Sequence, residues 1–278
     1  MQRALFYQRL KYNFLCRLDQ TLTFKMDIFI NVIDTILQVI LWYFMAQIIS
    51  HDTLGYENVG YLAFIFVGTM ASFFITEVTI ALSDSFNRDM SAGLLKLAYL
   101  ANIGIVEYFL INFFTSIVFS IFLYIAPLLG TYAIISSIAN DTTTLYINGL
   151  TILTLAISAI IFVMGNLGFN LMSMGATLYF KHGDPISFIL EQLNTFFSGQ
   201  IFPLSVLPRF LLFVPKIFPT AYIVILWREA LFLNKTILDS SVLHLSLVAV
   251  FINIFIFALG YIFFHRGVSR AKLEGRWF

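Results

Sequence analysis

The sequence predicts an all-α integral membrane protein with six transmembrane helices, and three observations carry this prediction. First, 60% of the 278 residues are hydrophobic and only 11% are charged, whereas a soluble domain carries roughly 25% charged residues. Second, five apolar windows meet or nearly meet the ~20 residues that cross a bilayer, and a sixth window is shorter. Third, the Lys and Arg residues are divided unevenly between alternate loops.

Six spans place both chain termini on the same side of the membrane. The far side then holds four of the 16 Lys and Arg residues, namely Arg209, Lys216, Arg228 and Lys235. Because cytoplasmic loops carry the excess of positive charge, both termini are expected in the cytoplasm. The chain is predicted to be one multi-pass domain, residues 1–278, in the cell (inner or plasma) membrane. The expected spans are Asp27–Ile49, Val59–Leu82, Val106–Ala126, Ile147–Met172, Ile186–Phe202 and Val242–Phe264.

The first 25 residues (1–25) predict an amphipathic helix that precedes the first span. Its apolar stripe consists of Leu5, Leu10, Phe14 and Leu18, with Tyr7 beside them, and Arg3, Arg9, Lys11 and Arg17 lie largely off that stripe. A basic amphipathic helix of this kind lies in the headgroup layer of a membrane. It could anchor the first span, dock a cytoplasmic partner, or do both.

The loop between the second and third spans, residues 83–105, predicts a short cytoplasmic helix. Ser85 or Asn87 offers an N-cap for it. Its apolar side carries Met90, Leu94, Leu95 and Leu97, and its polar side carries Arg88, Asp89 and Lys96. Such a helix suits either a groove on another protein or the lipid surface, and the pattern favours neither.

Four acids lie inside the predicted spans, all in the cytoplasmic half: Asp34, Glu77, Glu107 and Glu191. Each would cost ~2.5–3.5 kcal/mol near the bilayer centre. They are interpreted first as hydrogen-bonded or ion-paired acids near the interface. A second interpretation is an acidic entrance for a cationic or polar headgroup, and a proton relay is the third.

The outer segment, residues 203–233, is both apolar and interrupted. It holds four of the six prolines, Pro203, Pro208, Pro215 and Pro219, and each proline removes a backbone donor and breaks a helix. Leu204–Phe213 and Thr220–Leu233 are each too short to span the bilayer. Because freed backbone groups at membrane depth must be buried in protein or line a wet cavity, two re-entrant half-helices are expected here.

Several functions are disfavoured by what the sequence lacks. It contains no GxxxxGK[ST], HExxH or GxSxG pattern and only one cysteine, Cys16, so a nucleotide, zinc or hydrolase site is not expected in this chain. The net charge of +1 gives no broad basic face for nucleic acid. We expect a protein that is not an enzyme, with energy for any active process supplied by another chain or an ion gradient.

Two stretches resemble type-2 permeases of ABC exporters. The first is FNRDMSAGLLKLAYL, in which Arg88, Asp89, Gly93, Leu94 and Leu97 fit the coupling-helix region of that family and Lys96 departs from it. The second is an ordered set over about 30 residues that follows the fifth span. It consists of Ser198-Gly199, Phe202-Pro203, Leu207-Pro208, Pro219, Tyr222 and Arg228.

The resemblance implies a transport permease without a nucleotide site or cofactor of its own. Two copies of a separate ATPase subunit would bind ATP and Mg, and a second permease copy would complete a homodimer or heterodimer. The outer segment would form an export gate; a static lid that only seals the outer end is the alternative, and the two differ in motion. The gate residues implied are Phe202, Pro203, Leu207, Pro208, Phe218, Pro219 and Tyr222.

An amphiphilic substrate, such as a drug, lipid or peptide, is favoured because no aromatic band suited to a sugar polymer is apparent. Polysaccharide or glycolipid export by the same architecture remains an alternative. So does a gradient-driven transporter, which would need an inverted repeat and a midplane ion site. A membrane enzyme acting on lipid would need a nucleophile cluster near one interface.

Overall fold

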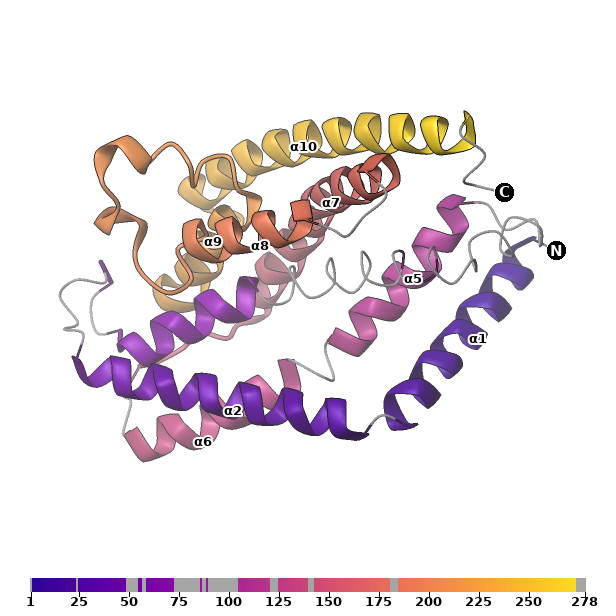
Figure 1. Ribbon diagram of the computed structural model, residues 1–278. Helices are drawn as coiled ribbons and strands as arrows, with labels where there is room; N and C mark the ends of the chain where they lie inside the picture. The colour runs from indigo at the N-terminus through magenta and orange to yellow at the C-terminus, as the bar shows by residue number, and fades with distance from the viewer. Residues whose placement is uncertain are drawn as a thin grey trace.

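In the computed structural model, the regular secondary structure of the described part of the chain is helical (Figure 1). That part comprises residues 2–23, 25–48, 55–56, 59–72, 86, 89, 105–120, 125–139, 143–180 and 185–273. Both termini lie at one end of the molecule, and the segment between α8 and α9 lies at the opposite end. In chain order the helices are α1 (Gln2–Thr23), α2 (Lys25–Ile48), the helix Tyr61–Ser72, α5 (Ile105–Ser120), α6 (Ala126–Ala139), α7 (Gly149–Phe180), α8 (Pro185–Phe197), α9 (Pro219–Leu233) and α10 (Ser240–Leu273).

Three of these helices are long and apolar enough to cross a membrane. They contain the segments Ile28–Ile48, Gly149–Tyr179 and Ser240–Arg270, which correspond to the first, fourth and sixth predicted spans. In the third predicted span, α5 ends at Ser120 and a separate helix, α6, begins at Ala126. Pro127 lies in the first turn of α6. Backbone N–H groups of a first turn make no hydrogen bond within the helix, so the missing N–H of proline costs nothing there. The sequence reading did not anticipate α6.

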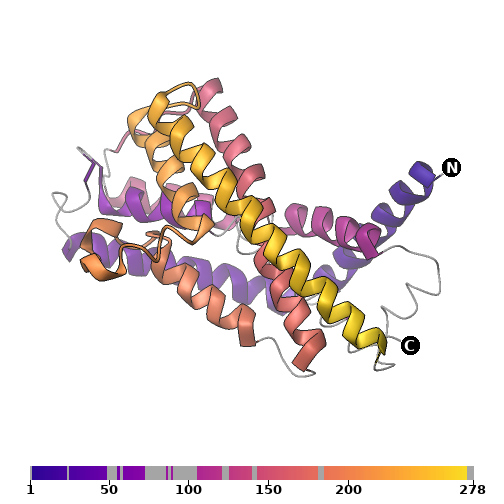
Figure 2. The same ribbon diagram turned by 90° about the horizontal axis from the view of Figure 1, so that it is seen from above.

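The longest helices, α7 and α10, lie against each other in both views (Figures 1 and 2). Their backbones meet at glycine pairs seven residues apart: Gly168 with Gly260, and Gly175 with Gly267. A Cβ atom at Gly260 would lie 2.8 Å from the Gly168 Cα, so only glycine permits this approach. Because residue numbers rise together along the seam, the two helices run in the same direction.

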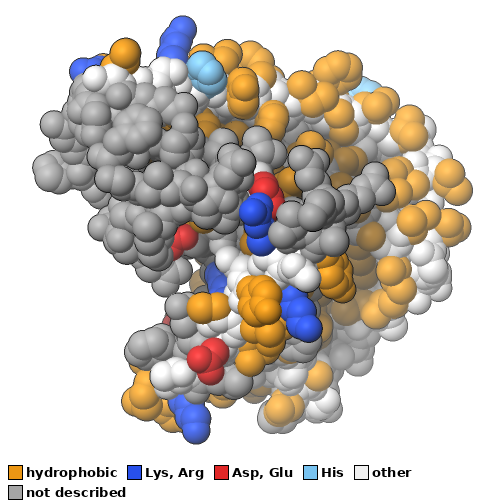
Figure 3. Space-filling view, turned by 90° about the vertical axis from the view of Figure 1, so that its right-hand side faces the viewer, with side chains coloured by type: hydrophobic (Ala, Val, Ile, Leu, Met, Phe, Trp, Pro, Cys, Tyr) orange, Lys and Arg blue, Asp and Glu red, His pale blue; other side chains and the backbone are white. Residues whose placement is uncertain are grey.

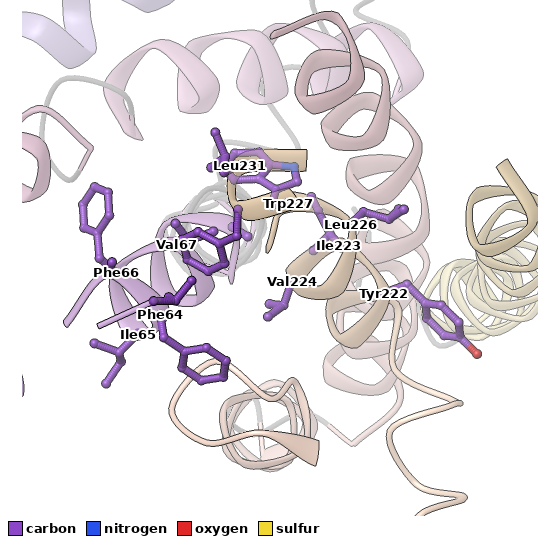
Figure 4. Close-up of a cluster of buried hydrophobic side chains, with 14 of the residues drawn as sticks. Phe64, Ile65, Phe66, Val67, Tyr222, Ile223, Val224, Leu226, Trp227 and Leu231 are labelled. Atoms are coloured by element: carbon purple, nitrogen blue, oxygen red, sulfur yellow. The ribbon is translucent and has the colours of Figure 1, made fainter. Parts of the chain in front are cut away.

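The largest buried cluster lies where α9 packs against the helix Tyr61–Ser72 (Figure 4). Phe64, Ile65 and Val67 are at most 1% exposed, as are Ile223 and Val224 on α9. Leu226 and Trp227 extend the cluster, and the Trp227 indole donates a hydrogen bond of 3.0 Å to Ser158 Oγ on α7. This cluster fixes α9 against two neighbouring helices.

The N-terminal helix α1 lies along α5 and directs a row of polar side chains at it. Arg9 Nη1 lies 2.7 Å from Glu107 Oε1, Asn13 Oδ1 accepts a bond of 3.1 Å from Thr115, and Arg17 donates one of 2.8 Å to Ser116. The sequence reading placed Arg9 and Arg17 on the headgroup side of this helix. In the structure the i, i+4 spacing instead aligns them with polar positions of α5.

The end of the molecule that carries both termini is shown in space-filling form in Figure 3. Lys, Arg, Asp and Glu side chains stand in the middle of that face, and hydrophobic side chains gather along one side of it.

Candidate functional site around Arg228

The site begins where α8 ends. Gly199 adopts a left-handed conformation (φ +75°), which terminates the helix after Phe197 and Ser198. The Ser198 amide still donates a hydrogen bond to Asn194 O, and the Gln200 amide donates one to Ser198 Oγ. Because the helix ends here, the carbonyl oxygens of Gly199 and Gln200 do not accept hydrogen bonds from a following helical turn.

Arg228, on α9, occupies the space in front of those two carbonyls. Its Nη1 donates to Gly199 O at 2.8 Å, and its Nη2 donates to Gln200 O at 2.8 Å. Nε and Nη2 both donate to Phe64 O, at 3.3 and 3.0 Å. The side chain thereby joins three segments that are far apart in sequence: the end of α8, the helix Tyr61–Ser72, and α9.

The guanidinium is almost fully buried and has no ion-pair partner among the described residues. Arg228 is 4% exposed, and its guanidinium carbon lies 3.4 Å from the centroid of the Phe64 ring. An Arg side chain remains cationic at neutral pH. Carbonyl dipoles and one aromatic face therefore stabilise the buried charge in place of a carboxylate.

Three further contacts tighten the same junction. Gly68 faces the guanidinium, and a Cβ atom there would lie 2.7 Å from Gln200 O. The Tyr61 hydroxyl donates to Ile201 O at 3.1 Å, and the Thr220 hydroxyl donates to Asn194 Oδ1. Chemically, the arrangement can hold backbone segments in fixed relative positions. Among the described residues that make these contacts, none is a Cys, His, Asp or Glu that could act as a nucleophile or general base.

The residues expected to form an outer gate follow Gln200 in the chain, in the loop and on α9, and they differ in burial. Leu207, Phe218, Pro219 and Tyr222 are buried, Phe202 and Pro203 are half-buried, and Pro208 is exposed. The Phe218 ring stacks near Phe169 and Phe197, with centroids 6.1 and 6.4 Å apart. The Tyr222 hydroxyl donates to Lys216 O at 3.0 Å.

The outer segment forms one half-helix, whereas the sequence predicted two. Pro219 begins α9 at its first turn, close to the predicted start at Thr220. The expected helix Leu204–Phe213 is replaced by two 3₁₀ turns, Leu204–Val206 and Arg209–Leu211. The reason is Pro208, which cannot donate a helical bond and disfavours helical backbone at the residue before it.

Of the residues expected in the coupling helix, the structure describes Asp89. Its carboxylate accepts a hydrogen bond from the Tyr108 hydroxyl on α5. Arg88, Gly93, Leu94 and Leu97 lie outside the described residues.

Of the four acids expected inside the spans, the structure describes the side chains of Asp34 and Glu107, and these two have different partners. Asp34 is exposed on α2 and accepts a bond of 2.9 Å from Gln38, and Glu107 pairs with Arg9. Glu77 and the side chain of Glu191 lie outside the described part. The partner of Glu107 is therefore a cation on α1.

The motif predicts no role for Arg228 of its own, and no sequence pattern marks Gly68. One signal was available for Arg228. It follows nine strongly apolar or small residues and is placed in an apolar helix, where a cation requires a local partner. Gly68 gives no comparable signal, because its role depends on a side chain 160 positions away. Within the described residues, no group of three or more His, Cys, Asp or Glu side chains could hold a metal ion.

Comparison with known proteins adds no relative. No protein-family model matches the chain, and no curated protein matches it.

Proposed function

We propose that this chain is the transmembrane subunit of an ATP-driven ABC exporter of the type-2 permease class. It would move an amphiphilic substrate, such as a drug, lipid or peptide, from the cytoplasm or inner leaflet outward. A separate ATPase subunit would supply the energy, and two permease copies would form the working dimer.

The observation that carries the proposal is the connection between the motif residues of the outer segment. Gly199, from the first part of the motif, accepts a bond from Arg228, its last member. Pro219 begins the helix that carries Arg228, and Tyr222 binds back to the preceding loop. The first and last parts of the motif that resembles the permease family are thus in direct contact, as a structural element of a gate would require.

The direction of the helices supports the six-span layout within the proposal. Spans four and six of that layout both run from outside to inside, and α7 and α10 run in the same direction along their glycine seam. The layout further requires that the segment between α8 and α9 lie opposite the two termini, as it does in Figure 1.

Two contacts support mechanical coupling between the cytoplasmic loop and the spans. Asp89 accepts a bond from Tyr108 on α5, and the Phe86 ring meets Phe264 on α10 with centroids 6.2 Å apart. Phe86 is fully buried with Met174 on α7. A push on this loop by an ATPase would therefore be transmitted to three helices.

Co-purification tests the proposal. The tagged chain is co-expressed with an ATPase encoded beside it, and the complex is isolated in mild detergent. We expect the ATPase to co-purify, and Gly93→Trp or Leu94→Glu to abolish its binding. Leu238→Glu, at a position 76% exposed on the opposite end, is the matched control and should retain the ATPase. Failure of the ATPase to bind, or binding unchanged in the loop variants, would reject the proposal.

Cysteine labelling tests the layout separately. In a Cys16→Ser background, Leu238→Cys should react with an impermeant maleimide in intact cells. Lys11→Cys should react only after the membrane is opened. The reverse pattern would contradict the predicted orientation.

A further inference from the structure

The loop of residues 203–217, between Gln200 and α9, presents large apolar side chains at the surface. Val206 is 66% exposed, Phe210 73%, Phe213 61% and Ile217 52%. Leu207, at 8% exposed, faces inward in the same loop, and Pro215 is also buried. Because these inward residues hold the loop against the protein, the exposed side chains form its outer surface.

The charged side chains of the loop itself are all cationic. Arg209 and Lys216 are both exposed and flank the exposed Phe210 and Phe213. No Asp or Glu occurs between Glu191 and Glu229. Apolar side chains interleaved with Lys and Arg are the composition of segments that rest in a headgroup layer and bind anionic lipid.

The backbone hydrogen bonds decide how deep this loop can lie. Six amides of the loop, and that of the next residue, Phe218, each donate to the residue three positions earlier, and Pro203, Pro208 and Pro215 have no N–H to satisfy. The donors are those of Val206, Leu207, Leu211, Leu212, Val214, Ile217 and Phe218. The remaining amides need water or phosphate oxygens, so the loop suits the headgroup layer but not the hydrocarbon core.

We propose that the loop of residues 203–217 docks into the headgroup layer of an anionic phospholipid membrane. Arg209 and Lys216 bind lipid phosphate groups, and Val206, Phe210, Phe213 and Ile217 insert just below them. This interaction holds the outer segment at a fixed depth, and it requires only that the chain reside in a membrane, whatever it transports.

Spin labelling in vesicles tests the docking. A nitroxide is attached to Phe210→Cys in the Cys16→Ser background, and the protein is reconstituted in phosphatidylcholine with or without phosphatidylglycerol. We expect several-fold more collisions with oxygen, relative to a water-soluble nickel complex, than for a label at Leu238→Cys. Leu238 is a suitable control because it is also highly exposed but lies beside Asp239. A label at Phe210→Cys that is as open to nickel as the control would overturn the proposal.

The cations are tested in the same labelled protein. With Arg209 and Lys216 intact, phosphatidylglycerol should increase the protection of the label from nickel. The double variant Arg209→Gln/Lys216→Gln should lose this dependence while eluting as a single peak on size exclusion, like the parent. If protection of the label from nickel does not change with phosphatidylglycerol, headgroup binding is refuted. Spin–spin broadening at Phe210→Cys, which requires a second copy of the chain at the loop, would refute docking on lipid.

Discussion

Arg228 binds Phe64 through both its backbone and its ring. Two guanidinium nitrogens donate to Phe64 O, and the guanidinium carbon lies 3.4 Å from the ring centroid. The remaining donors reach Gly199 O and Gln200 O. One side chain thus fixes where α8 ends relative to the helix Tyr61–Ser72. Any movement of the outer segment must either break these bonds or carry all three segments together.

Replacing Arg228 tests this junction. Arg228→Lys retains the charge but replaces three donor nitrogens by one, and Arg228→Met removes every side-chain donor to Phe64 O, Gly199 O and Gln200 O. Charge-assisted hydrogen bonds are worth roughly 1.5–3 kcal/mol each, so we expect a loss on the order of 3 kcal/mol or more for both variants. The measurement is the thermal unfolding midpoint of the detergent-solubilised protein. Arg209→Lys, at an exposed position, should leave the midpoint unchanged, and equal midpoints for all variants would show that the junction contributes no stability.

Gly68→Ala should destabilise the protein without altering any polar group. The added methyl would lie 2.7 Å from Gln200 O and would also meet the Arg228 guanidinium, and overpacking of this kind typically costs about 1–3 kcal/mol. The matched control is Gly130→Ala on α6, where nothing lies within 4 Å of the new Cβ atom. That change should stabilise by roughly 0.5–1 kcal/mol, because alanine favours a helix interior. If both substitutions shift the unfolding midpoint in the same direction, the close approach at Gly68 is not real.

Gly260→Ala tests the seam between α7 and α10. Its Cβ atom would meet Gly168 backbone atoms, with the Cα at 2.8 Å, and backbone cannot move aside as a flexible side chain can. Because close backbone contact drives helix association in a membrane, we expect a lower unfolding midpoint and less monodisperse protein on size exclusion. Leu247→Ala, at an exposed position of α10, should change neither result.

Features that depend on composition and periodicity could be predicted from the sequence. Features that depend on contacts between residues far apart in the chain could not. Apolar run length located α2, α7 and α10, and prolines located the break before α9. Run length could not separate α5 from α6, because the intervening residues are as apolar as the helices. The motif identified Ser198, Gly199 and Arg228 as belonging together. It could not reveal that the Arg228 side chain reaches Phe64, since that contact arises only when two helices pack.

The ion pair between Arg9 and Glu107 distinguishes between two roles for α1: resting in the headgroup layer and packing against α5. A helix that rests in the headgroup layer would leave its cations with lipid, whereas the structure gives Arg9 a carboxylate partner on α5. Both side chains are partly exposed, at 31% and 27%, so the interaction is worth only about 0.2–1 kcal/mol after solvent screening. A double-mutant cycle with Arg9→Gln and Glu107→Gln, measured by thermal unfolding, should show coupling of that size. The charge exchange Arg9→Glu/Glu107→Arg should restore most of the stability that either single reversal removes. Additive effects in the cycle would mean that α1 does not rest on α5 in the folded protein.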